Sequence, residues 1–243
     1  MRMPRLFRPS RRRRPHPLPP DLDEDARAII DMVAPFTMTS PERIVALRDA
    51  VRHVCRHGIA GSIVECGVWR GGSMMAAALT LLEIGERRPL YLFDTFDGMP
   101  PPAHCDRDLT GASAAELLEA EEPARGETWA RSPLAEVRRN LAATGYPAEL
   151  VTFVPGRVEE TIPLAAPDQI AVLRLDTDWY ESTRHELEHL FPRLAAGGVL
   201  IIDDYGHWQG ARRAVDEFLA ASKAPLLLSR IDYTGRLAVK VAC

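Results

Sequence analysis

The chain is predicted to adopt an α/β fold, in which helices cover both faces of a seven-stranded mixed sheet and a helical extension precedes the first strand. Three observations predict this fold. Short apolar runs alternate with helix-like segments from about residue 63. A Gly-rich turn follows the first of these runs, and acidic residues follow several others. The 243 residues, 46% of them hydrophobic, suffice for one such domain.

Two helices are expected before the sheet. The segment from Asp21 to Ala34 is the first of them. The second is marked more clearly, because Ser40 is a good N-cap, Pro41 suits the first helical position and Gly58 ends the apolar periodicity.

Seven strands and five further helices complete the predicted fold. The strands are expected at residues 63–66, 90–93, 151–154, 170–175, 199–202, 226–229 and 237–241. The helices are expected at residues 72–85, 132–144, near 159, 180–195 and 210–221, where Ser132 and Pro133 start one helix and Gly197 and Gly198 stop another. The last two strands are expected to pair antiparallel, because only a short turn near Thr234 joins them.

Two segments depart from this pattern. Residues 94–131 contain three consecutive prolines and an acid-rich stretch, and we predict that they form an active-site lid. Residues 1–20 are predicted to be a disordered Arg- and Pro-rich arm ahead of one domain at 21–243, since residues 1–17 hold seven of the 30 Lys and Arg residues and no acid. The remaining body is acidic, which argues against nucleic acid as the main partner.

Composition excludes several classes of protein. No apolar run reaches the roughly 18 residues that span a bilayer, so no membrane partner is expected. The four cysteines are widely spaced and form no CxxC pair, which indicates neither a disulfide framework nor a zinc site. Without a signal peptide, the expected location is the cytoplasm.

Four aspartates follow two neighbouring apolar runs. Asp176 and Asp178 come after residues 170–175, and Asp203 and Asp204 come after residues 199–202. If these runs are parallel strands, the four carboxylates meet at the edge where open α/β sheets bind ligands. They repel one another unless a cation lies among them, and oxygen ligands suit Mg²⁺. The alternatives are an N-cap role for Asp178 and turn caps for the other pair.

The Gly-rich turn from Glu65 to Ser73 follows the first predicted strand and opens a helix. Its glycines let the backbone approach a ligand, although a plain tight turn is the alternative. The turn lacks the dinucleotide-binding spacing because Trp69 stands at the second glycine position. Glu65 would repel a pyrophosphate and suits a cationic amino group, as in S-adenosylmethionine. Asp94, after the second strand, is a candidate for binding ribose hydroxyls or else a loop cap.

Five segments together resemble the macrocin O-methyltransferase family, bacterial enzymes that methylate sugar hydroxyls on macrolides and other natural products. The resemblance runs from about residue 30 to the end and rests on residues 37–44, 65–73, 92–100, 175–183 and 202–206.

This resemblance implies a Rossmann-like class I methyltransferase fold, S-adenosylmethionine as cofactor and a glycoside or glycan as small-molecule substrate, in a homo-oligomer. It also implies that Asp176, Asp203 and Asp204 bind one Mg²⁺, and that Asp178 is the general base beside the catalytic metal ligand Asp176. The expected cofactor-binding residues are Thr37, Met38, Glu65, Gly67, Arg70, Gly71, Gly72, Ser73 and Asp94, with Gly156 added from its position at the sheet edge.

Several other side chains have open roles. His207 could contact substrate or assist proton transfer, although a loop histidine is more often incidental. His185 and His189 share a helix face but lack the HExxH arrangement of zinc proteases. Aromatic residues near the acids could stack on a sugar or simply pack: Trp179, Tyr180, Tyr205 and Trp208.

Three other functions remain open on the sequence. A catechol-type O-methyltransferase also uses Mg²⁺ and neighbouring hydroxyls. A nicotinamide-dependent oxidoreductase is disfavoured by Glu65 and the missing glycine. A non-catalytic module could bind nucleic acid through the arginine arm.

Overall fold

The computed structural model describes residues 18–121, 128–222 and 225–242. One seven-stranded sheet lies at its centre, in the order β3-β2-β1-β4-β5-β7-β6. Strands β1 to β5 are parallel, β7 runs antiparallel to β5, and β6 runs antiparallel to β7. The predicted mixed sheet is therefore confirmed. The strand bounds are β1 Ser62–Cys66, β2 Leu90–Asp94, β3 Val151–Pro155, β4 Ile170–Leu175, β5 Leu194–Ile202, β6 Ser229–Arg230 and β7 Arg236–Val239.

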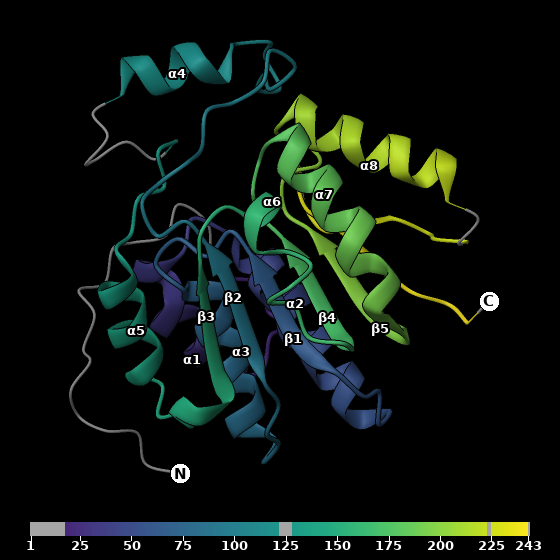
Figure 1. Ribbon diagram of the computed structural model, residues 1–243. Helices are drawn as coiled ribbons and strands as arrows, with labels where there is room; N and C mark the ends of the chain where they lie inside the picture. The colour runs from purple at the N-terminus through teal and green to yellow at the C-terminus, as the bar shows by residue number, and fades with distance from the viewer. Residues whose placement is uncertain (1–17, 122–127, 223–224, 243) are drawn as a thin grey trace.

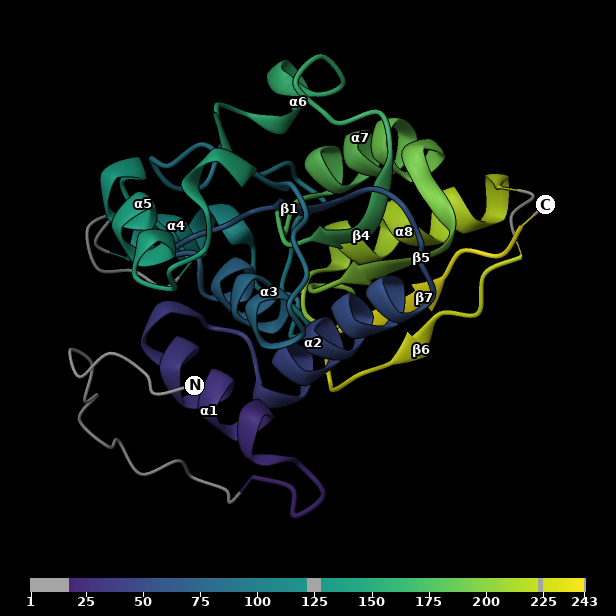
Figure 2. The ribbon, with the colours of Figure 1, turned by 90° about the horizontal axis from the view of Figure 1, so that it is seen from below.

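Helices cover both faces of the sheet (Figures 1 and 2). On one face α1, α2 and α3 pack together, with α5 beside α3, and α6, α7 and α8 lie on the other. The helix bounds are α1 Glu24–Val33, α2 Pro41–Arg56, α3 Gly72–Glu83, α4 Ala114–Ala120, α5 Leu134–Ala142, α6 Val158–Thr161, α7 Tyr180–Leu190 and α8 Gln209–Ala221.

Each face of the sheet has its own apolar core. Side chains alternate across a strand, so Ile63 packs with the helices of one face and Val64 with those of the other. All six residues of β4 are buried, as expected for a parallel strand covered on both sides. The one charged residue among them, Arg174, therefore requires a buried counter-charge.

The helices before the sheet begin as expected. The Ser40 hydroxyl accepts a hydrogen bond from the Arg43 amide, and Pro41 occupies the first turn of α2. In α1 the Asp23 carboxylate accepts a bond of 2.7 Å from the Ala26 amide.

Most predicted helix bounds differ from the observed ones by one to three residues, and the end of α7 differs by five. Helix α7 ends at Leu190 instead of Ala195, because Pro192 lies in a short 3-10 turn and β5 begins at Leu194. Gly197 and Gly198 thus lie inside a strand and stop no helix. At α5 the N-cap is Pro133, and the Ser132 hydroxyl has no hydrogen-bond partner among the described residues.

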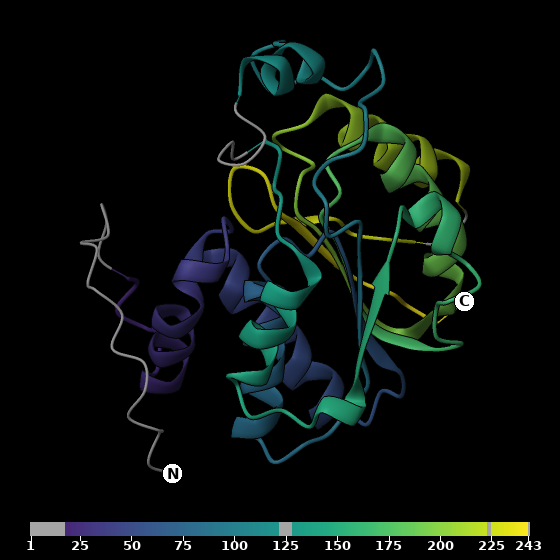
Figure 3. The same cartoon turned by 60° about the vertical axis from the view of Figure 1, so that its left-hand side comes forward.

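The segment 94–131 contains a helix that was not predicted, α4. It stands apart from the sheet (Figures 1 and 3). Leu118 of α4 packs in one apolar cluster with Trp179 and Trp208. The buried carboxylate of Asp106 accepts bonds from the Ala103 amide at 2.7 Å and the Tyr180 amide at 2.8 Å, which ties the segment to the start of α7. Residues 122–127 lie outside the residues that the structure describes. The function of this segment as an active-site lid stays a prediction.

The predicted arm lies outside the described residues up to position 17. Within the part of the chain that is described, none of the helices combines the length and apolar character that a membrane crossing requires.

Candidate active site

A cavity of about 360 Å³ opens where the parallel strands end. Residues from the ends of β1, β2, β3, β4 and β5 line it, together with the segment between α1 and α2. It therefore occupies the position at which open α/β sheets bind ligands. The predicted site residues that line it are Thr37, Met38, Gly67, Ser73, Asp94, Gly156, Asp176, Asp178, Asp203 and Asp204.

Asp94 organises the Gly-rich turn. One of its oxygens accepts bonds from the amides of Val68 and Trp69, at 2.6 and 3.0 Å, and the other accepts a bond of 2.6 Å from the Phe96 amide. Burial raises the pKa of Asp94, and these amide bonds oppose that rise. Gly67 has φ +80°, and a Cβ there would overlap the Asp176 carbonyl oxygen. Only glycine permits this approach of the turn to β4.

Four predicted cofactor residues do not line the cavity: Glu65, Arg70, Gly71 and Gly72. The Arg70 guanidinium donates to Glu136 and to the Pro35 carbonyl, both at 2.7 Å. Gly71 is the N-cap of α3 with φ +89°, and a Cβ on Gly72 would collide with Phe36. Direct contact of these four residues with the cofactor stays a prediction.

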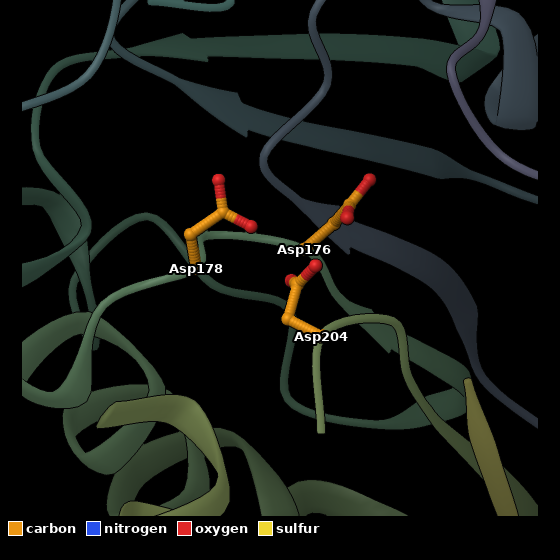
Figure 4. Close-up of side chains that lie close together, drawn as sticks. All are labelled: Asp176, Asp178 and Asp204. Carbon is orange, nitrogen blue, oxygen red and sulfur yellow. The ribbon is translucent and has the colours of Figure 1, made fainter. Parts of the chain in front are cut away.

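Three aspartates bring their carboxylates together at the ends of β4 and β5 (Figure 4). One oxygen each of Asp176, Asp178 and Asp204 lies within 4.8 Å of the other two. Burial raises the pKa of Asp178 to about 7. Burial also raises the pKa of Asp204, and the negative charges of Asp178 and Asp203 add to this rise. Because carboxylates this close repel one another, a proton or a bound cation among them is favoured. Asp178 has φ +66° and is no N-cap, because Trp179 occupies that position.

Arg174 is a buried cation that the sequence analysis did not include in the site. Its side chain is 2% exposed. One nitrogen donates to Glu65 at 2.7 Å and to Asp176 at 2.5 Å; the other donates to Asp203 and to the Thr39 hydroxyl. A single charge inside an apolar strand was the sequence signal for this role.

Glu65 lies behind this cation, away from solvent. Burial raises the pKa of Glu65 to about 7, against the lowering effect of Arg174. Its second oxygen has no hydrogen-bond partner among the described residues. A buried carboxylate oxygen without a donor is suited to an additional cationic or protic group.

Asp203 differs from the other three aspartates because two arginines already contact it. Arg174 binds one carboxylate oxygen and Arg43 the other. The Thr39 hydroxyl also donates to this carboxylate, at 3.1 Å. Asp203 therefore lies outside the three-acid cluster, and the predicted metal set of Asp176, Asp203 and Asp204 includes only two members of that cluster.

Trp179 and Tyr180 do not line the cavity. Trp179 is 2% exposed, meets Trp208 edge-on at 4.8 Å between ring centroids and donates to the Pro100 carbonyl at 2.9 Å. The Tyr180 hydroxyl donates to Glu217 on the surface. Trp208, in contrast, lines the cavity.

Of the three candidate histidines, only His207 lines the cavity, and His185 and His189 do not. Burial lowers the pKa of His207, which favours the neutral imidazole. A ring nitrogen of His185 lies 3.0 Å from the Ile162 carbonyl, and the His185 and His189 rings are 4.4 Å apart. No third metal-ligating side chain joins this pair among the described residues.

Comparisons with known proteins identify the family of the chain. Residues 18–239 match the family model described as Macrocin-O-methyltransferase (TylF). The 8-demethyl-8-(2,3-dimethoxy-alpha-L-rhamnosyl)-tetracenomycin-C 4'-O-methyltransferase of Streptomyces olivaceus is 36% identical over 204 residues, which cover 82% of this chain and 73% of the relative. The mycinamicin III 3''-O-methyltransferase of Micromonospora griseorubida is 35% identical over 183 residues, covering 75% and 69%.

Solved structures also resemble the chain. The O-methyltransferase NovP has a TM-score of 0.73 and 33% identity, covering 85% of this chain and 83% of NovP. The calicheamicin methyltransferase CalS11 has a TM-score of 0.63 at 20% identity, covering 89% and 91%, and supports the fold alone. The predicted class I methyltransferase fold is confirmed. The chain belongs to the macrocin O-methyltransferase (TylF) family and is an S-adenosylmethionine-dependent O-methyltransferase.

Proposed function

We propose that the chain transfers a methyl group from S-adenosylmethionine to a sugar hydroxyl of a glycosylated small molecule, and that Mg²⁺ orients the acceptor. One observation carries this proposal: the aspartates after β4 and β5 line the same cavity as the Gly-rich turn and Asp94. A methyl donor and a metal-bound acceptor can meet in that cavity. The names of two relatives support the acceptor class, since they specify a rhamnosyl tetracenomycin and a mycinamicin.

The donor set fits a hard divalent ion. All the candidate ligands are carboxylate oxygens, which Mg²⁺ prefers. Asp176 and Asp204 belong both to the geometric cluster and to the predicted set, so they form the centre of the proposed site. Asp203 is adjacent to Asp204 and is proposed as the third ligand, as the family resemblance implies. When bound, the ion supplies a positive charge that lowers the pKa of a sugar hydroxyl.

Asp178 is the proposed general base. In the metal-free protein, burial raises the pKa of Asp178 to about 7, which gives this carboxylate an affinity for a proton. It lines the cavity beside Asp176, and its carboxylate is not consumed by an N-cap bond. Asp178 would hold the proton that leaves the acceptor oxygen as the new carbon–oxygen bond forms and the carbon–sulfur bond of the donor breaks.

The cofactor is proposed to lie along the Gly-rich turn. Thr37, Met38 and Ser73 flank this part of the cavity, and Gly156 closes it at the end of β3. Asp94 fixes the turn through three amide bonds, accepts a longer bond of 3.4 Å from the Thr95 hydroxyl, and lines the cavity, where it is the candidate partner of a ribose hydroxyl.

The test is labelled methyl transfer to a panel of deoxysugar glycosides, hexose glycans and catechols. The proposal expects label on the sugar hydroxyl of a glycoside and none after EDTA treatment. Transfer to catechols alone would favour the catechol-type alternative, and full activity in EDTA would contradict the metal role. Calorimetry with S-adenosylhomocysteine and NAD provides the control against an oxidoreductase, which would bind NAD.

A further inference from the structure

Two arginines contact Asp203, and they differ in their freedom to move away from it. Arg174 lies inside β4 and holds Glu65, Asp176 and Asp203 together. Arg43 lies in the first turn of α2 and lines the cavity, and within the described part of the chain its ion pairs are with Asp203 and Asp232. Arg43 is the cation that can leave Asp203, because it lines the cavity and its other acid, Asp232, is not a proposed metal ligand, whereas Arg174 lies inside β4.

We infer that Arg43 takes the place of the divalent cation in the metal-free chain: it neutralises Asp203 there and shifts entirely to Asp232 when the ion binds. This inference rests on the proposed metal site. It assigns to Arg43 and Asp232 a role in metal affinity, although neither is a proposed ligand.

Three hydrogen bonds hold the Asp232 carboxylate in position to bind Arg43. The carboxylate accepts bonds from the Ser40 hydroxyl at 2.7 Å, from the Thr234 amide at 2.9 Å and from the Gly235 amide at 2.7 Å. These bonds fix the carboxylate in the turn between β6 and β7. The Arg43 Nε already donates to it at 3.0 Å. Arg43 therefore keeps a charged partner after it releases Asp203.

Burial makes the exchange necessary. The side chains of Arg43 and Asp203 are 9% and 4% exposed, so neither charge is well solvated. Arg174 is shared among three carboxylates, so the buried Asp203 keeps Arg43 as a second cation until another cation arrives. A divalent ion on the same carboxylate repels the guanidinium at short range. Arg43 and the ion thus compete for Asp203.

Competition between Arg43 and the ion, and simple positioning of Asp203 by Arg43, predict opposite changes in metal affinity. If Arg43 competes with the ion, Arg43→Gln raises metal affinity, because the rival cation is gone. If Arg43 only positions Asp203, the same substitution lowers affinity or leaves it unchanged. Asp232→Asn removes the alternative partner, so it strengthens the hold of Arg43 on Asp203 and lowers metal affinity. In the Arg43→Gln background, Asp232→Asn should have no further effect.

The experiment is calorimetric titration of the full chain with Mn²⁺, without acceptor, for the wild type, both single variants and the double variant. We expect about a tenfold gain in affinity for Arg43→Gln and about a tenfold loss for Asp232→Asn, in the range of coupling between contacting charged groups. Arg48→Gln is the matched control, because Arg48 is a buried arginine of the same helix whose acidic partners are Asp23 and Glu83. Its Mn²⁺ affinity should equal that of the wild type.

Circular dichroism establishes that each variant is folded. If Arg43→Gln fails to fold, Asp232→Asn decides: unchanged or higher Mn²⁺ affinity overturns the inference. Unchanged or lower affinity in a folded Arg43→Gln protein overturns it as well. A wild type that binds no Mn²⁺ overturns the proposed metal site together with the inference, so the two failures are distinguishable.

Discussion

Replacing Arg174 by methionine removes the cation that three carboxylates share. Arg174 donates to Glu65, Asp176 and Asp203, and the first and last of these residues are 1% and 3% exposed. Methionine fills a similar volume but carries no charge, so the substitution leaves the buried Glu65 without a cation and Asp203 with Arg43 alone. We expect a large loss of folding stability in the absence of metal.

The size of the loss follows from burial. Removing one partner of a buried ion pair costs about 3–5 kcal/mol, out of a total domain stability of about 5–15 kcal/mol. In a domain of this size each kcal/mol shifts Tm by about 2–4 °C, so Tm should fall by roughly 6–20 °C. The loss should be smaller at acidic pH, because Glu65 and its neighbours then become protonated in the folded protein and need no counter-charge. Glu65 already has a pKa of about 7 with Arg174 present, and it rises further without it.

Thermal unfolding followed by circular dichroism at pH 8 and pH 5.5, in EDTA, measures both effects. Arg48→Met is the matched control, because its partners Asp23 and Glu83 are more exposed and can be solvated without it. A loss below about 1 kcal/mol for Arg174→Met, or an equal loss at both pH values, would refute the role assigned to this cation.

Four further predictions follow from the same contacts. Asp178→Asn should reduce turnover by about 10²–10⁴-fold while Mn²⁺ and S-adenosylhomocysteine affinity persist, as measured by labelled methyl transfer and calorimetry. Asp94→Asn should weaken S-adenosylhomocysteine binding by about 10- to 100-fold in calorimetry, because the turn loses a charged acceptor. The metal-free protein should lose stability as pH rises from about 4 to about 7, because folded Glu65 binds its proton more tightly than unfolded Glu65 does; Glu65→Gln should flatten that part of the urea-unfolding profile. EDTA should abolish turnover and Mg²⁺ should restore it, and an EDTA-resistant rate would contradict the metal proposal.

Much of the fold could be predicted from local patterns. Apolar strands alternate with capped helices, and the acids follow the apolar runs, so both the sheet and the edge that carries Asp176 and Asp204 could be predicted from the sequence. The end of α7 was missed because the glycines were taken as its stop, whereas Pro192 precedes an early start of β5. Helix α4 was missed inside a Pro-rich, acidic stretch.

The cations of the site could be predicted only in part. Arg174 interrupts an apolar strand and was visible as an anomaly in the sequence. Arg43 and Thr39 reach Asp203 from more than 150 positions away, and local periodicity carries no information on such contacts. Charge balance offers a general route: four aspartates at one edge of the sheet imply cations nearby, and a buried arginine is a candidate before any metal.

The proposed acceptor chemistry is tested most directly by locating the transferred methyl group. The protein would be incubated with Mg²⁺, S-adenosylmethionine carrying a ¹³C methyl group and a panel of deoxysugar glycosides, and the products would be analysed by NMR. We predict a ¹³C methyl ether on a sugar oxygen, lost in EDTA and in Asp178→Asn. Label on a phenolic oxygen, or on no oxygen of any glycoside while catechols are methylated, would contradict the proposal.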